Sequence, residues 1–187
     1  MRARGHTVCL TREPGGAPGA ELLRTLLLDG TQDWSAAAET YLHFAARAEH
    51  LERTILPALA RGGWVVCDRF ADSTMAYQGW GQGGGQGGGQ GGGQGGERAL
   101  ITALTALLPV QPARTLVLTV QPGIAAARVA GRGLMPDRYE RQDAAFHDRV
   151  RAGYAAIAAA DPVRCRIIPA DGTPATVHAA VLQALEL

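Results

Sequence analysis

Short apolar runs alternate along the chain with longer segments that have helical spacing. The runs cover residues 7–10, 64–67, 115–120 and 166–169, and several of their residues are β-branched. Strands that alternate with helices are typical of a parallel sheet with helices on both faces. The pattern therefore predicts a single α/β domain over residues 1–187, a length that can bury its own core.

The segments between these runs predict helices at 20–28, 35–60, from 97 to the proline breaks at 109 and 112, at 143–160 and at 173–187. In the first helix, the leucines at 22, 23, 26 and 27 share one face. Ser35 can cap the second, although Glu39 stands one position later than the acid of a capping box. Thr173 and Pro174 suit the start of the last helix.

A glycine- and glutamine-rich tract at 81–96 interrupts this pattern. Glycine loses much backbone entropy on folding, and glutamine amides are the only functional side chains of the tract. We interpret the tract as a flexible loop expanded by slippage, with a ligand-binding lid as the alternative. We assign it no chemistry.

Composition narrows the kind of partner. The formal net charge of +1 gives no reason to expect broad attraction to nucleic acid or to an anionic membrane. No apolar stretch approaches the roughly 20 residues that span a bilayer, and no signal-like region follows Met1. The three cysteines lack zinc-like spacing and adjoin apolar runs, so buried reduced thiols are expected. We expect a cytoplasmic protein with a small anionic ligand.

The most specific local motif follows the apolar run at 64–67. Asp68 and Arg69 would lie at the carboxyl edge of a parallel sheet, where open α/β folds bind ligands. A carboxylate there can hold Mg²⁺, usually through water, and a guanidinium can bind two phosphate oxygens. An ordinary ion pair at the strand end is the alternative. The sequence S-T-M-A-Y-Q-G at 73–79 favours the ligand site.

Two further segments can face the same ligand. The sequence T-R-E-P-G-G at 11–16 would let backbone approach a ligand closely, with Arg24 in the helix that follows. On the long helix, His43 and Arg47 share a face and Phe44 lies one step round. An aromatic ring beside a guanidinium can stack on and hydrogen-bond to a nucleobase, although a helical phenylalanine more often belongs to the core.

Arginines gather in a glycine-hinged segment at about 128–142: Arg128, Arg132, Arg138 and Arg141. Such a segment can close over a polyphosphate as a lid and neutralise charge in a phosphoryl-transfer transition state. A solvated charged face is the alternative.

Together and in this order, the motifs resemble the bacterial thymidylate kinase family, which has a P-loop NTPase-like, three-layer α/β/α fold with a parallel sheet. The likeness covers nearly all of residues 2–187 and includes T-R-E-P-G-G, D-R, A-Y-Q-G and the D-R-Y-E at 137–140. It implies a nucleoside monophosphate kinase that transfers the γ-phosphoryl group of ATP to dTMP and forms dTDP, with Mg²⁺. It also implies a homodimer.

The resemblance implies roles on the phosphate side of the site. Arg69 and Arg24 would bind the dTMP phosphate, and Asp68 would order Mg²⁺ and its water. Arg132, together with Arg138, would be the lid arginine that reaches the transferred phosphoryl group of ATP.

It implies roles on the base side too. Arg47 and Gln78 would read the thymine edge, and Tyr77 would pack under the deoxyribose, where its bulk disfavours a 2′-hydroxyl. The family has a stacking aromatic residue where this chain has His43, so that either this imidazole or the neighbouring Phe44 would stack on thymine. Further polar contacts to the base would come from Ser73 or Thr74.

Members of this family begin with a strand and a G-x-x-x-x-G-K-[ST] loop that cradles phosphates. This chain contains no such motif, and none of its 18 basic residues is a lysine. The resemblance therefore implies that the first, central strand and its phosphate-binding loop are lacking. We expect the natural protein to start upstream of Met1. The alternatives are a non-catalytic remnant that binds dTMP or serves only as an interaction surface, and a kinase for another nucleoside monophosphate.

Overall fold

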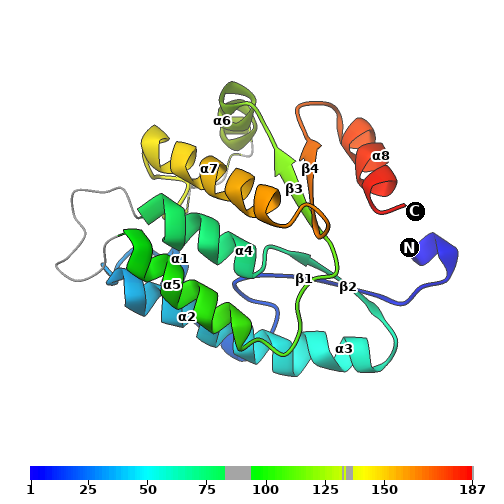
Figure 1. The fold of residues 1–187 in the computed structure, drawn as a ribbon, viewed down its shortest axis with the longest axis horizontal. Coiled ribbons are helices and arrows are strands. Elements are labelled where there is room, and N and C mark those ends of the chain that lie inside the picture. The colour runs from blue at the N-terminus through cyan, green and yellow to red at the C-terminus, as the bar shows by residue number, and fades with distance from the viewer. Residues whose placement is uncertain (83–93, 132, 134–136, 187) are drawn as a thin grey trace. The chain divides into compact units, whose positions relative to one another are not determined.

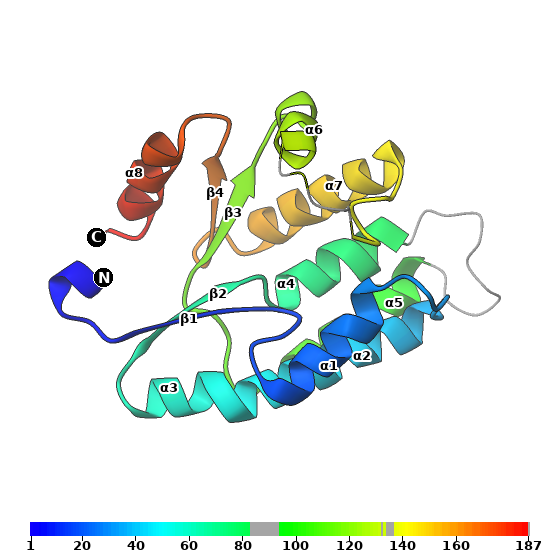
Figure 2. The same cartoon turned by 180° about the vertical axis from the view of Figure 1, so that it is seen from behind.

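The computed structural model describes residues 1–82, 94–131, 133 and 137–186. The chain divides into two compact units. Unit 1 comprises Met1–Pro109 and Asp137–Gly153, and unit 2 comprises Val110–Pro136 and Tyr154–Leu187 (Figures 1 and 2). The expectations of a single domain and of a missing upstream strand stay predictions.

Unit 1 contains a parallel ladder of two strands, β1 (Val8–Arg12) and β2 (Trp64–Asp68). Val8 lies opposite Trp64, and Arg12 lies opposite Asp68. Parallel strands end at the same edge of their sheet, so the segments that follow both strands begin side by side. The ladder thus brings the T-R-E-P-G-G and D-R motifs together although they are far apart in sequence.

The helices of unit 1 are α1 (Pro18–Leu28), α2 (Ala36–His50), α3 (Leu56–Ala60), α4 (Ala71–Thr74), α5 (Gln94–Ala106) and the first part of α7 (Ala144–Ala160). π-helical turns follow α2 at Leu51–Ile55 and α4 at Met75–Gly81. α2 packs between α1 and α5 (Figures 1 and 2). As expected, Ser35 caps α2, because its Oγ accepts a hydrogen bond from the Ala38 amide at 3.3 Å.

The buried face of α1 is narrower than the leucine pattern predicts. Leu27 is fully buried, and Leu23 packs on a small cluster of alanines from α1 and α2, whereas Leu22 and Leu26 are exposed. Residues four apart share a face, so Leu23 and Leu27 turn inward together and Leu22 and Leu26 turn outward together. Only half of the leucine face is therefore buried.

Unit 2 contains a second parallel ladder, formed by β3 (Thr115–Thr119) and β4 (Cys165–Pro169), with α6 (Pro122–Gly131) and α8 (Pro174–Ala184). Thr173 caps α8 by accepting from the Thr176 amide at 3.2 Å, with Pro174 at the first helical position as expected. The sequence pattern missed α6. Arg128, on this helix, donates to the carbonyl oxygens of residues 170, 171 and 172, so it holds the loop after β4.

The four predicted strands are confirmed to within two residues at each end. Most of the glycine- and glutamine-rich tract, residues 83–93, lies outside the described residues. All three cysteines are free thiols, but only Cys165 is buried; Cys9 and Cys67 are half-buried on the β1–β2 ladder. Among the described helices, none combines the length and the apolar character required to cross a membrane.

Candidate active site

A pocket in unit 1 collects most of the residues that the sequence singles out. Its lining includes the predicted Arg24, His43, Arg47, Arg69, Ser73, Thr74, Tyr77 and Gln78. It also includes residues to which sequence reasoning gave no role: Glu13, Pro14, Leu28, Phe70, Asp137, Tyr139, Glu140 and His147. The pocket therefore lies where the ends of β1 and β2 meet α2, α4 and the D-R-Y-E segment.

Arg69 enters this pocket through an unusual backbone conformation. Its φ of 70° lies in the left-handed region, which costs a non-glycine residue about 1 kcal/mol or more. The Arg69 guanidinium carbon lies 4.7 Å from the centre of the Tyr77 ring. Strain of this kind is typical of functional sites, and here it turns the arginine from the strand end towards the pocket.

Glu13 is the centre of a buried ionic cluster on one side of the pocket. Its Oε2 accepts from Arg47 Nε at 2.8 Å, and its Oε1 lies 3.1 Å from His50 Nδ1. The second nitrogen of His50 lies 2.7 Å from Thr11 Oγ1. Arg47 also donates through Nη2 to Thr74 Oγ1 at 3.0 Å. These bonds fix the direction of Arg47, whose guanidinium lies over the Phe44 ring at 4.6 Å.

One nitrogen of the Arg47 guanidinium is not used by these bonds. Its Nη1 is buried and has no hydrogen-bond partner among the described residues. Burial lowers the pKa of Arg47, and the neighbouring Glu13 carboxylate opposes that shift. A buried donor without a partner costs roughly 1–3 kcal/mol. The pocket therefore offers a positioned donor that an acceptor on a ligand can satisfy.

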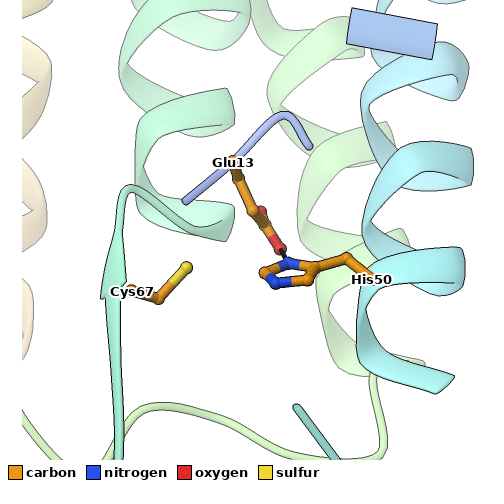
Figure 3. Close-up of side chains that lie close together, drawn as sticks. All are labelled: Glu13, His50 and Cys67. Atoms are coloured by element: carbon orange, nitrogen blue, oxygen red, sulfur yellow. Dashed lines mark hydrogen bonds and ion pairs between the residues drawn. The ribbon is translucent and has the colours of Figure 1, made fainter. Parts of the chain in front are cut away.

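Glu13, His50 and Cys67 lie close enough to suggest a metal site, since their ligand atoms all fall within 4.8 Å of one another (Figure 3). However, Glu13 pairs with Arg47, and both ring nitrogens of His50 lie within hydrogen-bond distance of protein oxygens. Burial, together with the nearby carboxylates of Glu13 and Asp68, raises the pKa of the Cys67 thiol to about 12. A metal needs a thiolate and would lie beside a guanidinium, so Glu13 and His50 are better explained as a hydrogen-bonded support for Arg47. Cys67 Sγ instead donates to the Arg69 carbonyl oxygen at 3.0 Å.

Glu39 is the centre of a second buried cluster, on the D-R-Y-E side. Its Oε1 accepts from Gln78 Nε2 at 2.8 Å, from Gln82 Nε2 at 2.7 Å and from Tyr139 Oη at 2.7 Å. Its Oε2 lies 2.7 Å from Arg138 Nη1. Burial, and secondarily the Glu39 charge, raise the pKa of the Tyr139 phenol. Tyr139 therefore stays protonated and donates a hydrogen bond to Glu39.

His43 joins this cluster from α2. Its Nε2 lies 3.0 Å from Tyr139 Oη. Burial, and then the positive charges of Arg47, Arg138 and Arg69, lower the pKa of His43 to about 3. The imidazole at the pocket wall is therefore neutral at physiological pH. Because the Tyr139 hydroxyl already donates its hydrogen bond to Glu39, it can only accept from His43. The Nε2 atom of His43 must therefore carry a hydrogen and donate to the tyrosine oxygen.

Some predicted residues do not come into the pocket. Phe44 is buried behind Arg47 and is not part of the lining, because it lies one helical step away from His43. Asp68 is exposed at the end of β2 and is also outside the lining. Arg138 is engaged by Glu39, and Arg132 lies outside the described residues.

The pocket and cluster residues that the sequence analysis missed differ in how visible they are in the sequence. Glu13 stands within the T-R-E-P-G-G motif, so its position was known but not its buried pairing. Tyr139 stands in D-R-Y-E, and Glu39 was read only as a late capping residue. The Glu39–Tyr139 bond joins residues 100 positions apart, which no local pattern reveals.

The pocket combines cationic groups at Arg24 and Arg69 with a polar wall at Arg47 and Gln78, as a nucleotide site requires. The Thymidylate kinase family model matches residues 1–181. The chain belongs to the thymidylate kinase family. It is 51% identical over 185 residues to the thymidylate kinase of Gluconobacter oxydans, covering 99% of this chain and 83% of that protein.

Other members of the thymidylate kinase family agree. The Rhizorhabdus wittichii thymidylate kinase is 48% identical, with 99% of this chain and 85% of that protein covered. The crystal structure of the Ehrlichia chaffeensis thymidylate kinase is 33% identical and superposes with a TM-score of 0.72, covering 97% of this chain and 81% of that chain. The expected family, its P-loop NTPase fold class and its enzyme class, a kinase of dTMP that uses ATP, are confirmed. The non-catalytic and other-substrate alternatives are not favoured.

Proposed function

We propose that the pocket of unit 1 is the dTMP site of an enzyme that transfers the γ-phosphoryl group of ATP to dTMP. The observation that carries the proposal is the buried Nη1 of Arg47, a fixed donor at the pocket without a partner among the described residues. Exocyclic oxygen O4 of thymine is an acceptor of the required kind.

On the phosphate side, Arg69 and Arg24 bind the dTMP phosphate. Both line the pocket, and Arg24 Nη1 is held by the Pro14 carbonyl oxygen at 2.7 Å. Guanidinium groups suit phosphate because they donate several hydrogen bonds from one rigid plane. Tyr77, which also lines the pocket, packs against the sugar. Its ring is held edge-on to the Tyr139 ring, with the ring centres 5.5 Å apart.

On the base side, Arg47 donates to O4 and Gln78 contacts the adjacent N3–H. Ser73 and Thr74 line the same wall and supply further polar contacts. His43, neutral and part of the lining, stacks on thymine in the place where the family has an aromatic residue.

Magnesium is proposed at Asp68. Its carboxylate is exposed at the end of β2, and oxygen ligands that retain water suit Mg²⁺. Bound there, the ion would neutralise charge on the transferred phosphoryl group. Arg132 and Arg138 are proposed as lid arginines on the ATP side, which for Arg138 requires release from Glu39. A cytoplasmic homodimer is part of the same proposal.

Calorimetric titration of dTMP into Arg69→Ala and Arg61→Ala tests the site. Arg69 lines the pocket, whereas Arg61 is an exposed residue of the turn before β2. Loss of a charge-assisted phosphate contact should weaken dTMP binding at least about tenfold in Arg69→Ala. Arg61→Ala should bind like the wild type, and equal effects would show that the site is misplaced.

A coupled assay with dTMP, dUMP, UMP and CMP tests the substrate. We expect dTMP to give the highest kcat/KM, with ribonucleotides disfavoured by the bulk of Tyr77. A preference for UMP or CMP would contradict both the substrate and the role of Tyr77.

A further inference from the structure

Gln78 is a proposed base-reading group that can be either a donor or an acceptor towards the base. A glutamine side chain can present either its carbonyl oxygen or its NH₂ group to a ligand by turning over. Cytosine and thymine differ at the edge that Gln78 faces, because thymine N3 carries a hydrogen and cytosine N3 is an acceptor. Whatever fixes the amide orientation of Gln78 therefore decides which base fits.

The contacts of Gln78 determine this orientation. Its Nε2 lies 2.8 Å from Glu39 Oε1 and 3.1 Å from Tyr139 Oη. A carboxylate only accepts hydrogen bonds, so the NH₂ group must face Glu39. The Tyr139 hydroxyl already donates a hydrogen bond to the same carboxylate oxygen at 2.7 Å, so the tyrosine oxygen can only accept from Gln78 Nε2. The reversed amide would place its oxygen against two acceptors.

Glu39 is itself firmly held. It is fully buried on α2, and Arg138 lies 2.7 Å from its second oxygen. Gln82 donates to the first oxygen from the turn after Gln78. Glu39 lies outside the pocket lining and acts on a ligand through the lining residues that it binds, Gln78 and Tyr139.

We infer that Glu39 is a positioning residue for base specificity: it fixes Gln78 with its carbonyl oxygen towards the base, so that the pocket accepts N3–H and rejects an acceptor at N3. The inference rests on the proposed function, because it assumes that the base lies against Arg47 and Gln78. It assigns the choice of a thymine-like over a cytosine-like edge to a residue that touches neither base.

Glu39→Gln tests this role because Arg138 dictates how the new amide lies. Arg138 requires an acceptor at the position of Oε2, so the new carbonyl oxygen occupies it and the new NH₂ group faces Gln78. Gln78 must then turn over to present its oxygen to residue 39 and its NH₂ group to the base. The ratio of the dCMP to the dTMP dissociation constant, measured by calorimetry, should fall at least about tenfold.

Gln82→Ala is the matched control. It removes a donor from the same Glu39 oxygen but leaves the Gln78–Glu39 bond, so the ratio should stay within about threefold of the wild-type value. Glu39→Asp, which keeps a carboxylate, should recover most of the wild-type ratio. A Glu39→Gln ratio equal to that of the wild type would overturn the inference.

The wild-type protein supplies a second arm that does not depend on whether a variant folds. dTMP methylated at N3 lacks the hydrogen that the Gln78 oxygen accepts, so it should bind at least about tenfold more weakly than dTMP. Equal affinity of the wild type for the methylated and unmethylated nucleotides, or for dCMP and dTMP, would also overturn the inference. Failure of the wild type to bind dTMP at all would instead contradict the proposed function.

Discussion

Glu13 and Glu39 are both buried carboxylates beside one pocket, but they hold different partners. Glu13 pairs with the guanidinium of Arg47 and the ring of His50. Glu39 pairs with Arg138 and accepts from two neutral amides and a phenol. Glu13 leaves a donor at the pocket, Nη1 of Arg47, and Glu39 leaves an acceptor, the carbonyl oxygen of Gln78. A single residue type thus produces opposite polarities, according to what it binds.

The largest expected effect is the loss of stability when the Glu13 cluster is broken. Glu13→Ala leaves Arg47, only 2% exposed, without its carboxylate, and breaking a buried pair in this way costs about 3–5 kcal/mol. Urea unfolding of the variant should show this loss in the free energy of unfolding. Glu49→Ala, which removes a partner from the exposed Arg53, should lose only about 0.5 kcal/mol. A loss below about 1 kcal/mol for Glu13→Ala would mean that the Glu13 cluster does not depend on its charge pair.

The next largest effect is the pH dependence of stability that His43 gives to the Glu39 cluster. Folded His43 stays neutral down to about pH 3, whereas in the unfolded chain it takes up a proton near pH 6.5. The unfolded state therefore binds more protons between these values, and stability falls as the pH drops from 6.5 towards 3. At pH 5 the cost is about 2 kcal/mol relative to pH 7.

His43→Phe removes this contribution. The fall in the free energy of unfolding between pH 7 and pH 5 should be about 2 kcal/mol smaller in the variant than in the wild type. Charged groups close to His43, namely Arg47, Arg138 and Arg69, are present in both proteins. Parallel pH curves for the two proteins would contradict a neutral, buried His43.

The smallest expected effect comes from an exposed carboxylate near the same motif. Glu21 is paired with Arg12 at 3.1 Å, with both side chains about half exposed. The pKa of Glu21 is lowered first by the Gly16 amide and less by Arg12. Arg12→Ala should therefore change the free energy of unfolding by only about 0.5 kcal/mol, measured by urea unfolding. A loss comparable to that of Glu13→Ala would remove the contrast between exposed and buried pairs.

The sequence predicts the strands and the motifs at their ends better than it predicts the Glu39 cluster. Strand positions follow from apolar runs, and the parallel pairing of β1 and β2 carries Arg69 and the T-R-E-P-G-G motif to the same edge. Motif residues elsewhere in the chain, such as Arg47, Tyr77 and Gln78, line the same pocket.

The Glu39 cluster was not predictable in the same way. Its members come from α2, from the turn after α4 and from the D-R-Y-E segment, and only tertiary packing brings them together. Helical spacing placed His43 and Phe44 side by side, but it could not show that Phe44 is covered by Arg47. Likewise, the arginine run gave no sign that Arg128 binds loop carbonyl oxygens or that Arg138 pairs with a carboxylate on α2.

A crystal structure of the protein with dTMP tests the central claim most directly. The account predicts thymine in the pocket of unit 1, with O4 within hydrogen-bond distance of Arg47 Nη1 and N3 facing the Gln78 carbonyl oxygen. Glu39 should remain bonded to the Gln78 NH₂ group, and the phosphate should lie at Arg69 and Arg24. A nucleotide bound elsewhere, or a base that contacts neither Arg47 nor Gln78, would contradict it.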